Sequence, residues 1–347
     1  MLSESPRHRQ RLLLRRYPAL IGTVAVVACG AAVTNGAGVS VGARRQVWAF
    51  TAPWDARSDA SARAHASQLD AIVYGWIQLD SLTGLPFSGF RDTVSRTAPS
   101  GMRPMAIVTN AVAGRFHAEA VRRLAADRAT LGRAAADIAR RAVSGGYRGL
   151  VLDLEALGRA DLPANRAVVE AIADSARAVG IAPIAVAIPA VDTAGYPASA
   201  FVPAADYVLV MLYDQHWTTS PPGPIAAPDW VRRALAMRVA EVGPSRVVAA
   251  LPLYGYRWPT DRPASGITFD EARRDAAAAG VDLRRDPASQ TLHAARQGAW
   301  ELWVSDAGLL SVLLRDVDAL GVRIVALWRL GQEDPAFWSL LEGKSGN

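Results

Sequence analysis

Two carboxylates two positions apart, Asp153 and Glu155, are the side chains of this sequence best placed for acid–base chemistry. They follow an apolar stretch, Gly149–Leu152, that is typical of a buried β-strand. Because residues i and i+2 of a strand point to the same face, the two carboxyl groups should lie side by side. Repulsion between them favours a proton on one, which can then act as a general acid. The alternative is a strand that simply ends in acidic residues, and this pattern alone does not decide between the two.

Further aromatic and polar side chains follow the ends of other strand-like stretches. Aromatic faces stack on the apolar faces of sugar rings, whereas carboxylates and amides bind hydroxyl groups, so this mixture is typical of a carbohydrate site. For Trp76, and for Trp217 further along, packing in the core or at the rim explains the residue equally well. The candidates for contact with a sugar are Trp54, Asp55, Trp76, Asn110, Met211, Tyr213, Asp214, Tyr254, Tyr256 and Trp328.

The elements that must position these side chains alternate between strand and helix from residue 47 onward. This pattern predicts an α/β fold, a closed (β/α)8 TIM barrel whose active site lies at the carboxyl ends of the strands. A doubly wound open sheet is the alternative, but it usually has fewer strands. No Gly-x-Gly-x-x-Gly follows the first strand, so we expect no dinucleotide cofactor, and no other cofactor is indicated. The eight predicted strands are residues 47–52, 71–76, 104–109, 149–153, 183–188, 207–212, 247–253 and 323–328.

The connection between the seventh and eighth predicted strands is unusually long. Residues 255–305 within it contain an alanine-rich helical stretch and an alternating, strand-like one. We interpret them as a small α+β insertion on the rim of the barrel. The predicted domains are therefore residues 1–46, which precede the fold, and residues 47–340, which form the barrel and its insertion.

The N-terminal 46 residues combine an arginine-rich start with the apolar run from Tyr17 to about Val33. This pattern indicates a membrane-targeting segment whose basic flank stays in the cytoplasm, so the barrel should lie outside it. Val26–Cys29 is similar to a bacterial lipobox, which makes Cys29 a lipidation candidate. Tyr17–Val41 is alternatively long enough for an uncleaved transmembrane anchor. An ordinary cleaved signal, which would leave a secreted protein, is the third possibility.

The distribution of charge excludes several classes of partner. Residues 1–46 carry seven arginines against Glu4, so the whole formal charge of +6 is in this stretch and residues 47–347 are neutral. A nucleic-acid-binding domain would show a basic patch in its folded part, so we expect no nucleic-acid partner. The five histidines lack metal-ligand spacing and there is one cysteine, so no metal site is predicted. The oligomeric state is not set by the sequence.

Five short motifs, in the expected order over about residues 47–340, resemble glycoside hydrolase family 18, the chitinase and N-acetylglucosaminidase family. The chain's ending, Leu330–Pro335, looks most like the bacterial cell-envelope and spore-cortex enzymes of this family. The motifs are Arg148–Glu155 on the fourth strand, Met211–Asp214 on the sixth, Leu251–Gly255 on the seventh, Leu302–Ala307 after the insertion, and Ala326–Gly331 on the eighth.

The resemblance implies hydrolysis of β-1,4-linked N-acetylglucosamine glycans, such as peptidoglycan, chitin or an exopolysaccharide, by a retaining, substrate-assisted mechanism. Glu155 would be the general acid and base. Asp153 would orient the substrate's acetamide group and stabilise its developing charge. Tyr213 and Asp214 would hold the acetamide carbonyl, and Trp328 would form the floor under the sugar.

Departures from the family pattern raise a second interpretation. The first two aspartates of the family's fourth-strand motif are here Arg148 and Val151, its tryptophan is Leu154, and the first-strand tyrosine is Thr51. The second of those aspartates normally shares a proton with the residue that Asp153 matches, so we expect Asp153 to lack that partner and to stay ionised. A catalytically weak or inactive glycan-binding barrel of the same fold is therefore the alternative function.

Overall fold

The computed structural model describes residues 44–90 and 101–342. The predicted lipidation candidate Cys29 and the predicted anchor Tyr17–Val41 lie outside these residues. Within the described ranges, no helix combines the length and the apolar character that crossing a membrane requires.

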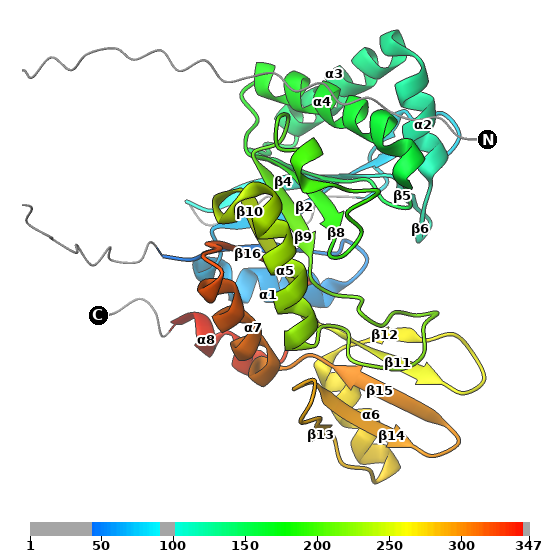
Figure 1. Ribbon diagram of the computed structural model, residues 1–347, viewed down its shortest axis with the longest axis vertical. Coiled ribbons are helices and arrows are strands. Elements are labelled where there is room, and N and C mark those ends of the chain that lie inside the picture. The colour runs from blue at the N-terminus through cyan, green and yellow to red at the C-terminus, as the bar shows by residue number, and fades with distance from the viewer. Residues whose placement is uncertain (1–43, 91–100, 343–347) are drawn as a thin grey trace, which may run out of the picture. The chain divides into compact units, whose positions relative to one another are not determined.

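Eight parallel strands form a closed barrel in the described part of the chain (Figure 1). Each strand pairs with its neighbour along the chain, and β1 closes the ring by pairing with both β2 and β16. The predicted α/β barrel is therefore confirmed and the open sheet is wrong. The barrel strands are β1 (Gln46–Phe50), β2 (Ala71–Leu79), β4 (Arg103–Thr109), β7 (Leu150–Asp153), β8 (Ile184–Pro189), β9 (Tyr207–Met211), β10 (Val247–Pro252) and β16 (Ile324–Trp328).

Helices between the strands bury one apolar face against the barrel and end at recognisable caps. In α3, the Asp127 side chain accepts hydrogen bonds from two backbone amides of the first turn, and Gly145 ends the helix. Leu131, Ala135 and Ile138 recur at helical spacing along its buried face. The helices are α1 (Ala56–Ala64), α2 (Ala118–Ala126), α3 (Arg128–Ser144), α4 (Leu162–Ala178), α5 (Pro228–Val242), α6 (Phe269–Ala279), α7 (Ala307–Ala319) and α8 (Ser339–Glu342).

The inside of the barrel is filled by apolar side chains from alternate positions of the strands. Trp48 and Tyr207 meet edge to face in this interior, with ring centroids 5.7 Å apart. Val151 of β7 is fully buried in the same cluster, with Ile107 and Leu209. Large side chains thus fill the interior of the barrel, and open space is left at the carboxyl ends of the strands.

An antiparallel sheet and α6 make up the segment between β10 and α7. The sheet has the strand order β12-β11-β15-β14-β13 and shares an apolar cluster with α6, which includes Ala272, Ala276 and Trp300. Thr268 and Glu271 form a reciprocal capping box at the start of α6. The strands are β11 (Gly255–Pro259), β12 (Ser265–Ile267), β13 (Arg284–Arg285), β14 (Leu292–Arg296) and β15 (Trp300–Val304).

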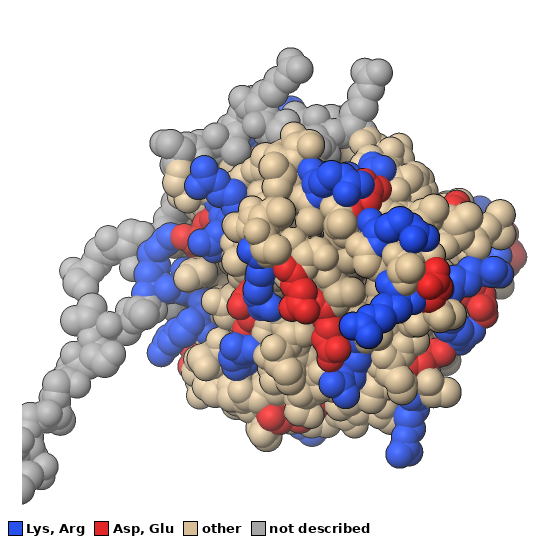
Figure 2. Space-filling model, turned by 90° about the horizontal axis from the view of Figure 1, so that it is seen from above, with Lys and Arg blue, Asp and Glu red and all other residues tan. Residues whose placement is uncertain are grey.

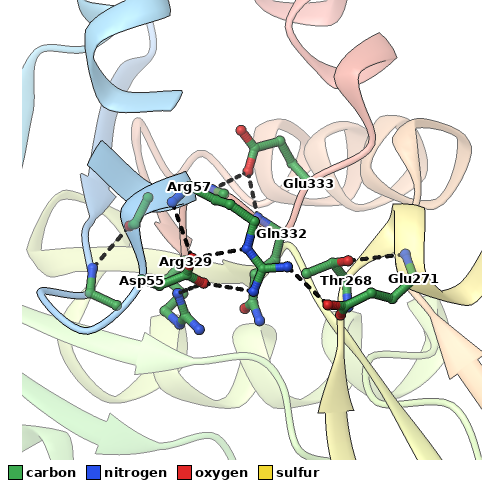
Figure 3. A network of polar contacts seen from close by, with 10 residues as sticks. Asp55, Arg57, Thr268, Glu271, Arg329, Gln332 and Glu333 are labelled. Atoms are coloured by element: carbon green, nitrogen blue, oxygen red, sulfur yellow. Dashed lines mark hydrogen bonds and ion pairs between the residues drawn. The ribbon is translucent and has the colours of Figure 1, made fainter. Parts of the chain in front are cut away.

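A polar network joins this α6 segment to the barrel (Figure 3). Asp55, at the N-terminus of α1, accepts from Arg57 Nε at 2.9 Å and from Arg329 Nη1 at 2.9 Å. Arg57 also donates to Glu271 Oε1 at 2.9 Å, which links the barrel to the capping box of α6. The loops after β1 and β16 are therefore tied to each other and to the first turn of α6.

Three short strands outside the α6 segment were not predicted. β3 (Pro86–Phe87) pairs antiparallel with the end of β2, and β5 (Ala111–Val112) pairs with β6 (Arg115–Phe116) in a hairpin directly after β4. Ala113 and Gly114 at the hairpin's turn have φ values of 51° and 76°, the left-handed pair that favours a tight two-residue turn. Alanine at the first of these positions gives no turn signal, which explains why the sequence pattern missed the hairpin.

Charged side chains on the outer face above α3 and α4 are mixed in sign (Figure 2). Some pair along a helix, as Arg141 does with Asp137 at 3.0 Å and Arg166 with Glu170 at 3.2 Å. Exposed pairs of this kind contribute little to stability. This face therefore shows interspersed charge in place of a basic patch.

Candidate active site

A cavity of about 260 Å³ opens at the carboxyl ends of the barrel strands. Aromatic and apolar side chains form most of its wall, with carboxylates from β7 and the loop after β9. Within the described part of the chain, no arginine or lysine lines it. The lining residues are Phe50, Trp54, Trp76, Ile107, Ala111, Gly114, Phe116, Val151, Asp153, Glu155, Ala187, Leu209, Met211, Tyr213, Asp214 and Trp328.

Asp153 and Glu155 lie together at this cavity, as their spacing predicted. Asp153 is the last residue of β7 and pairs in register with Thr109 of β4. Its carboxylate is buried, is hydrogen-bonded to Glu155, and accepts from Thr109 Oγ1 at 3.3 Å. The chain leaves the strand after Asp153, so Glu155 sits in the following turn, while the two carboxyl groups still meet.

Burial sets the protonation of this carboxyl pair. It raises the pKa of Asp153 to about 6, although hydrogen bonds from Glu155 and Thr109 oppose the rise. Burial also raises the pKa of Glu155 well above its ordinary value, and repulsion from Asp153 raises it further. Because the two carboxylates repel, the pair favours a single proton, held on Glu155 beside Asp153. A half-buried acid beside a buried carboxylate is an arrangement suited to proton transfer.

Apolar and aromatic groups surround the pair. Val151 lies one pleat below Asp153 and is fully buried, so the position that resembles a family aspartate is occupied by hydrocarbon. The Tyr213 and Trp328 rings are nearly parallel, at an interplanar angle of 16° with centroids 6.4 Å apart. Phe50 meets the Trp328 ring edge to face at 5.3 Å. Trp328 is thereby fixed as one wall of the cavity.

Asp214 lines the cavity from the loop after β9 and is held by two tyrosines. Its Oδ1 accepts from the Tyr254 hydroxyl and, at 3.1 Å, from the Tyr256 hydroxyl. Burial raises the pKa of Tyr254 well above its ordinary value, so its hydroxyl stays protonated and remains a donor. The structure places Tyr254 behind Asp214 and outside the lining, whereas Met211 lies in the lining as predicted.

Trp54 and Asp55, the two predicted residues after β1, lie in different surroundings. Trp54 is 55% exposed, lines the cavity, and meets Trp76 at 5.0 Å between ring centroids. Asp55 stands outside the described lining, because its carboxylate is taken up by two arginines. Burial raises the pKa of Asp55, but the hydrogen bonds from Arg57 and Arg329 outweigh it and lower the pKa to about 2. Asp55 therefore acts in the polar network that joins the loops, where the sequence suggested a sugar contact.

The sequence missed one prominent lining residue, Phe116 of β6. It is 38% exposed and reaches the cavity from the unpredicted hairpin. An expected hairpin after β4 would have been the signal for it. Among the described residues, no group of three or more histidine, cysteine, aspartate or glutamate side chains could hold a metal ion.

A closed parallel barrel with an acidic pair at the end of its fourth strand and a tryptophan at the end of its eighth matches the arrangement that the family resemblance implied. No protein-family model matches the chain. In sequence it is 24% identical over 241 residues to the sporulation-specific glycosylase YdhD of Bacillus subtilis. That match covers 65% of this chain and 57% of the relative, so the chain spans little more than half of that protein's length.

Solved structures agree with this relationship. A class V chitinase from Pseudomonas fluorescens superposes with a TM-score of 0.78 at 25% identity, over 86% of this chain and 98% of that one. The spore cortex-lytic enzyme SleL of Bacillus cereus superposes with a TM-score of 0.75 at 21% identity, over 86% of this chain and 74% of that one. The predicted relationship to glycoside hydrolase family 18 is thus confirmed, and the relatives bear the names of enzymes that act on glycans.

Proposed function

We propose that this protein hydrolyses β-1,4-linked N-acetylglucosamine glycans, such as peptidoglycan, chitin or an exopolysaccharide. The observation that carries the proposal is the hydrogen-bonded Asp153–Glu155 pair in the lining of an aromatic cavity. The relatives named as chitinase, cortex-lytic enzyme and glycosylase support a substrate of this class. The absence of arginine and lysine from the described cavity lining suits a neutral sugar at the point of cleavage.

The proposed reaction uses the substrate's own acetamide group as nucleophile. Glu155 donates its proton to the glycosidic oxygen while the acetamide oxygen attacks the anomeric carbon, so the bond to the leaving sugar breaks and a cyclic oxazolinium forms. Ionised Asp153 orients the acetamide N–H and stabilises the positive charge. Tyr213 and Asp214 hold the acetamide carbonyl side, and Trp328 supports the sugar ring. Glu155 then removes a proton from water, which opens the intermediate with net retention.

Trp54, Trp76 and Met211 are proposed to contact the sugars, on the basis of their place in the cavity wall. We also propose that the barrel works outside the cytoplasm, attached to the membrane through the N-terminal segment. The basic flank and apolar run of that segment are its support. Mass spectrometry of the mature N-terminus distinguishes a lipid on Cys29 from an uncleaved Tyr17–Val41 anchor and from a cleaved signal.

A second candidate function, glycan binding with weak or absent catalysis, has its support in Val151. The valine replaces a carboxylate that would share a proton with Asp153, and it leaves apolar packing in its place. The elevated pKa values of Asp153 and Glu155 favour the enzyme, because a protonated acid and an ionised stabiliser coexist without that partner.

Release of 4-methylumbelliferone from N-acetylglucosaminides, run beside digestion of chitin and peptidoglycan, separates the two candidates. The enzyme cleaves at least one of these substrates, and a thiazoline that mimics the cyclic intermediate inhibits it. Binding to the polymers without cleavage of any substrate would establish the binding function. Cleavage that the thiazoline leaves unaffected would rule out the substrate-assisted mechanism.

A further inference from the structure

The turn that carries Glu155 lies beyond the hydrogen-bonded ladder of the barrel. β7 ends at Asp153, and Ala156 adopts a left-handed conformation with φ at 59°. The backbone groups from Leu154 to Leu157 must therefore find partners outside the strand, because unpaired buried groups are costly. These partners decide where the Glu155 side chain points.

Asn110 supplies two of these partners. Its Nδ2 donates to the Glu155 carbonyl oxygen at 2.9 Å, and its Oδ1 accepts from the Glu155 backbone N–H at 2.9 Å. The side-chain amide thus imitates a peptide group and extends the pairing of β4 with β7 past Thr109 and Asp153. Asn110 is fully buried, so its amide is held in this orientation.

Tyr196 supplies two further partners from the opposite side of the turn. Its hydroxyl donates to the Leu154 carbonyl oxygen at 2.9 Å and accepts from the Leu157 backbone N–H at 3.1 Å. These two groups flank Glu155 on either side in the chain. One buried hydroxyl therefore joins the beginning of the turn to its end.

The loop that presents Tyr196 is itself anchored by a buried arginine. Arg238 of α5 is fully buried and donates to the carbonyl oxygens of Pro189, Ala190, Asp192 and Tyr196 at 2.7 to 3.1 Å. Its charge is balanced by Glu241 at 2.9 Å. Because five hydrogen bonds fix Arg238, the loop is held in place and the Tyr196 hydroxyl has a defined position against the turn.

We propose that Asn110 and Tyr196 are positioning residues for Glu155, an inference that rests on the proposed glycosidase function. Together they pair four backbone groups between Leu154 and Leu157 from two sides and keep the Glu155 carboxyl group beside Asp153. Both stand outside the described residues that line the cavity, so they act through Glu155 and not on the sugar. If either side chain is removed, the turn loses two hydrogen bonds, and the carboxyl groups of Asp153 and Glu155 move apart.

The test compares wild type with Tyr196→Phe, Asn110→Ala and the control Tyr147→Phe. Tyr147 is also buried but packs against Tyr74 on another part of the barrel. We expect kcat to fall roughly tenfold to a hundredfold in the two turn variants with little change in KM, since small misplacements of a catalytic group act at this level. The alkaline limb of the pH–rate profile should move to lower pH, because Glu155 loses part of the burial and of the repulsion from Asp153 that raise its pKa. The control should match wild type in kcat and in both limbs.

A titration independent of turnover separates this inference from the proposed function. The pKa of Glu155 is followed by 13C NMR of its carboxyl carbon, assigned with Glu155→Gln. A lower pKa in both turn variants and an unchanged one in Tyr147→Phe support the positioning role. An unchanged Glu155 pKa in Tyr196→Phe and Asn110→Ala overturns it, whatever the activity. If wild type cleaves no glycan while the pKa still shifts, the glycosidase function fails and the positioning role stands.

Discussion

Replacing Asp153 by asparagine should make the protein more stable at alkaline pH while removing activity. Burial raises the pKa of Asp153 from 3.8 to about 6 in the folded protein, so the fold binds this proton more tightly than the unfolded chain does. The resulting stabilisation is complete below pH 3.8 and is lost as the pH rises through 6. At about 1.4 kcal/mol for each tenfold change in proton affinity, the ionised carboxylate destabilises the fold by about 3 kcal/mol at pH 8.

Urea unfolding at pH 4, 6 and 8 measures this difference for wild type, Asp153→Asn and the control Asp174→Asn at an exposed position of α4. The free energy of unfolding of Asp153→Asn should be close to that of wild type at pH 4. It should exceed the wild-type value by about 3 kcal/mol at pH 8. The control should follow wild type at all three values. A difference between Asp153→Asn and wild type that does not grow with pH would refute the assignment of a buried, destabilised carboxylate at this position.

Three further substitutions test the surroundings of the site. Thr109→Val removes the hydroxyl that stabilises ionised Asp153, so the acid limb of kcat/KM should move to higher pH by up to about one unit, and an unmoved limb would contradict this. Val151→Asp places a third carboxyl group in apolar packing and should lower the free energy of unfolding by about 2–4 kcal/mol at pH 7 but less at pH 5, where that group is protonated. A loss independent of pH would indicate a packing defect instead. Arg238→Met leaves four backbone carbonyls, of β8 and the loop after it, without their Arg238 donor and should destabilise the fold by about 3 kcal/mol or more in urea unfolding. A change of less than about 1 kcal/mol in the free energy of unfolding would show that the loop keeps its conformation without Arg238.

The barrel strands were predictable because each is a short apolar run with a clear end. Residues 149–153 were predicted as the fourth strand, and β7 covers Leu150–Asp153. The meeting of Asp153 and Glu155 also followed from their spacing, although the strand ends between them. Val151 could be placed below Asp153 by the same alternation, and the structure confirms its burial. Local periodicity is sufficient to predict the position of a side chain whose direction is set by its own strand.

The remaining features depend on contacts that no local pattern records. Asp55 looked like a sugar ligand, but its side chain caps α1 by accepting from the Arg57 N–H and also pairs with Arg329, which is far along the chain. The helix therefore begins at Ala56, directly after this capping residue. Tyr196 reaches the turn after β7 from a loop about forty residues away, and only the closed barrel brings the two together.

Hydrolysis of a soluble N-acetylglucosamine oligomer by wild type and Glu155→Gln tests the central claim most directly. Glutamine keeps the size of the side chain but cannot donate the proton, so kcat should fall at least about a hundredfold while the oligomer still binds. The Glu155→Gln protein should unfold at the same urea concentration as wild type or a higher one, because an acid with a raised pKa is removed. A variant that cleaves the oligomer at the wild-type rate would contradict the role of Glu155 as the general acid.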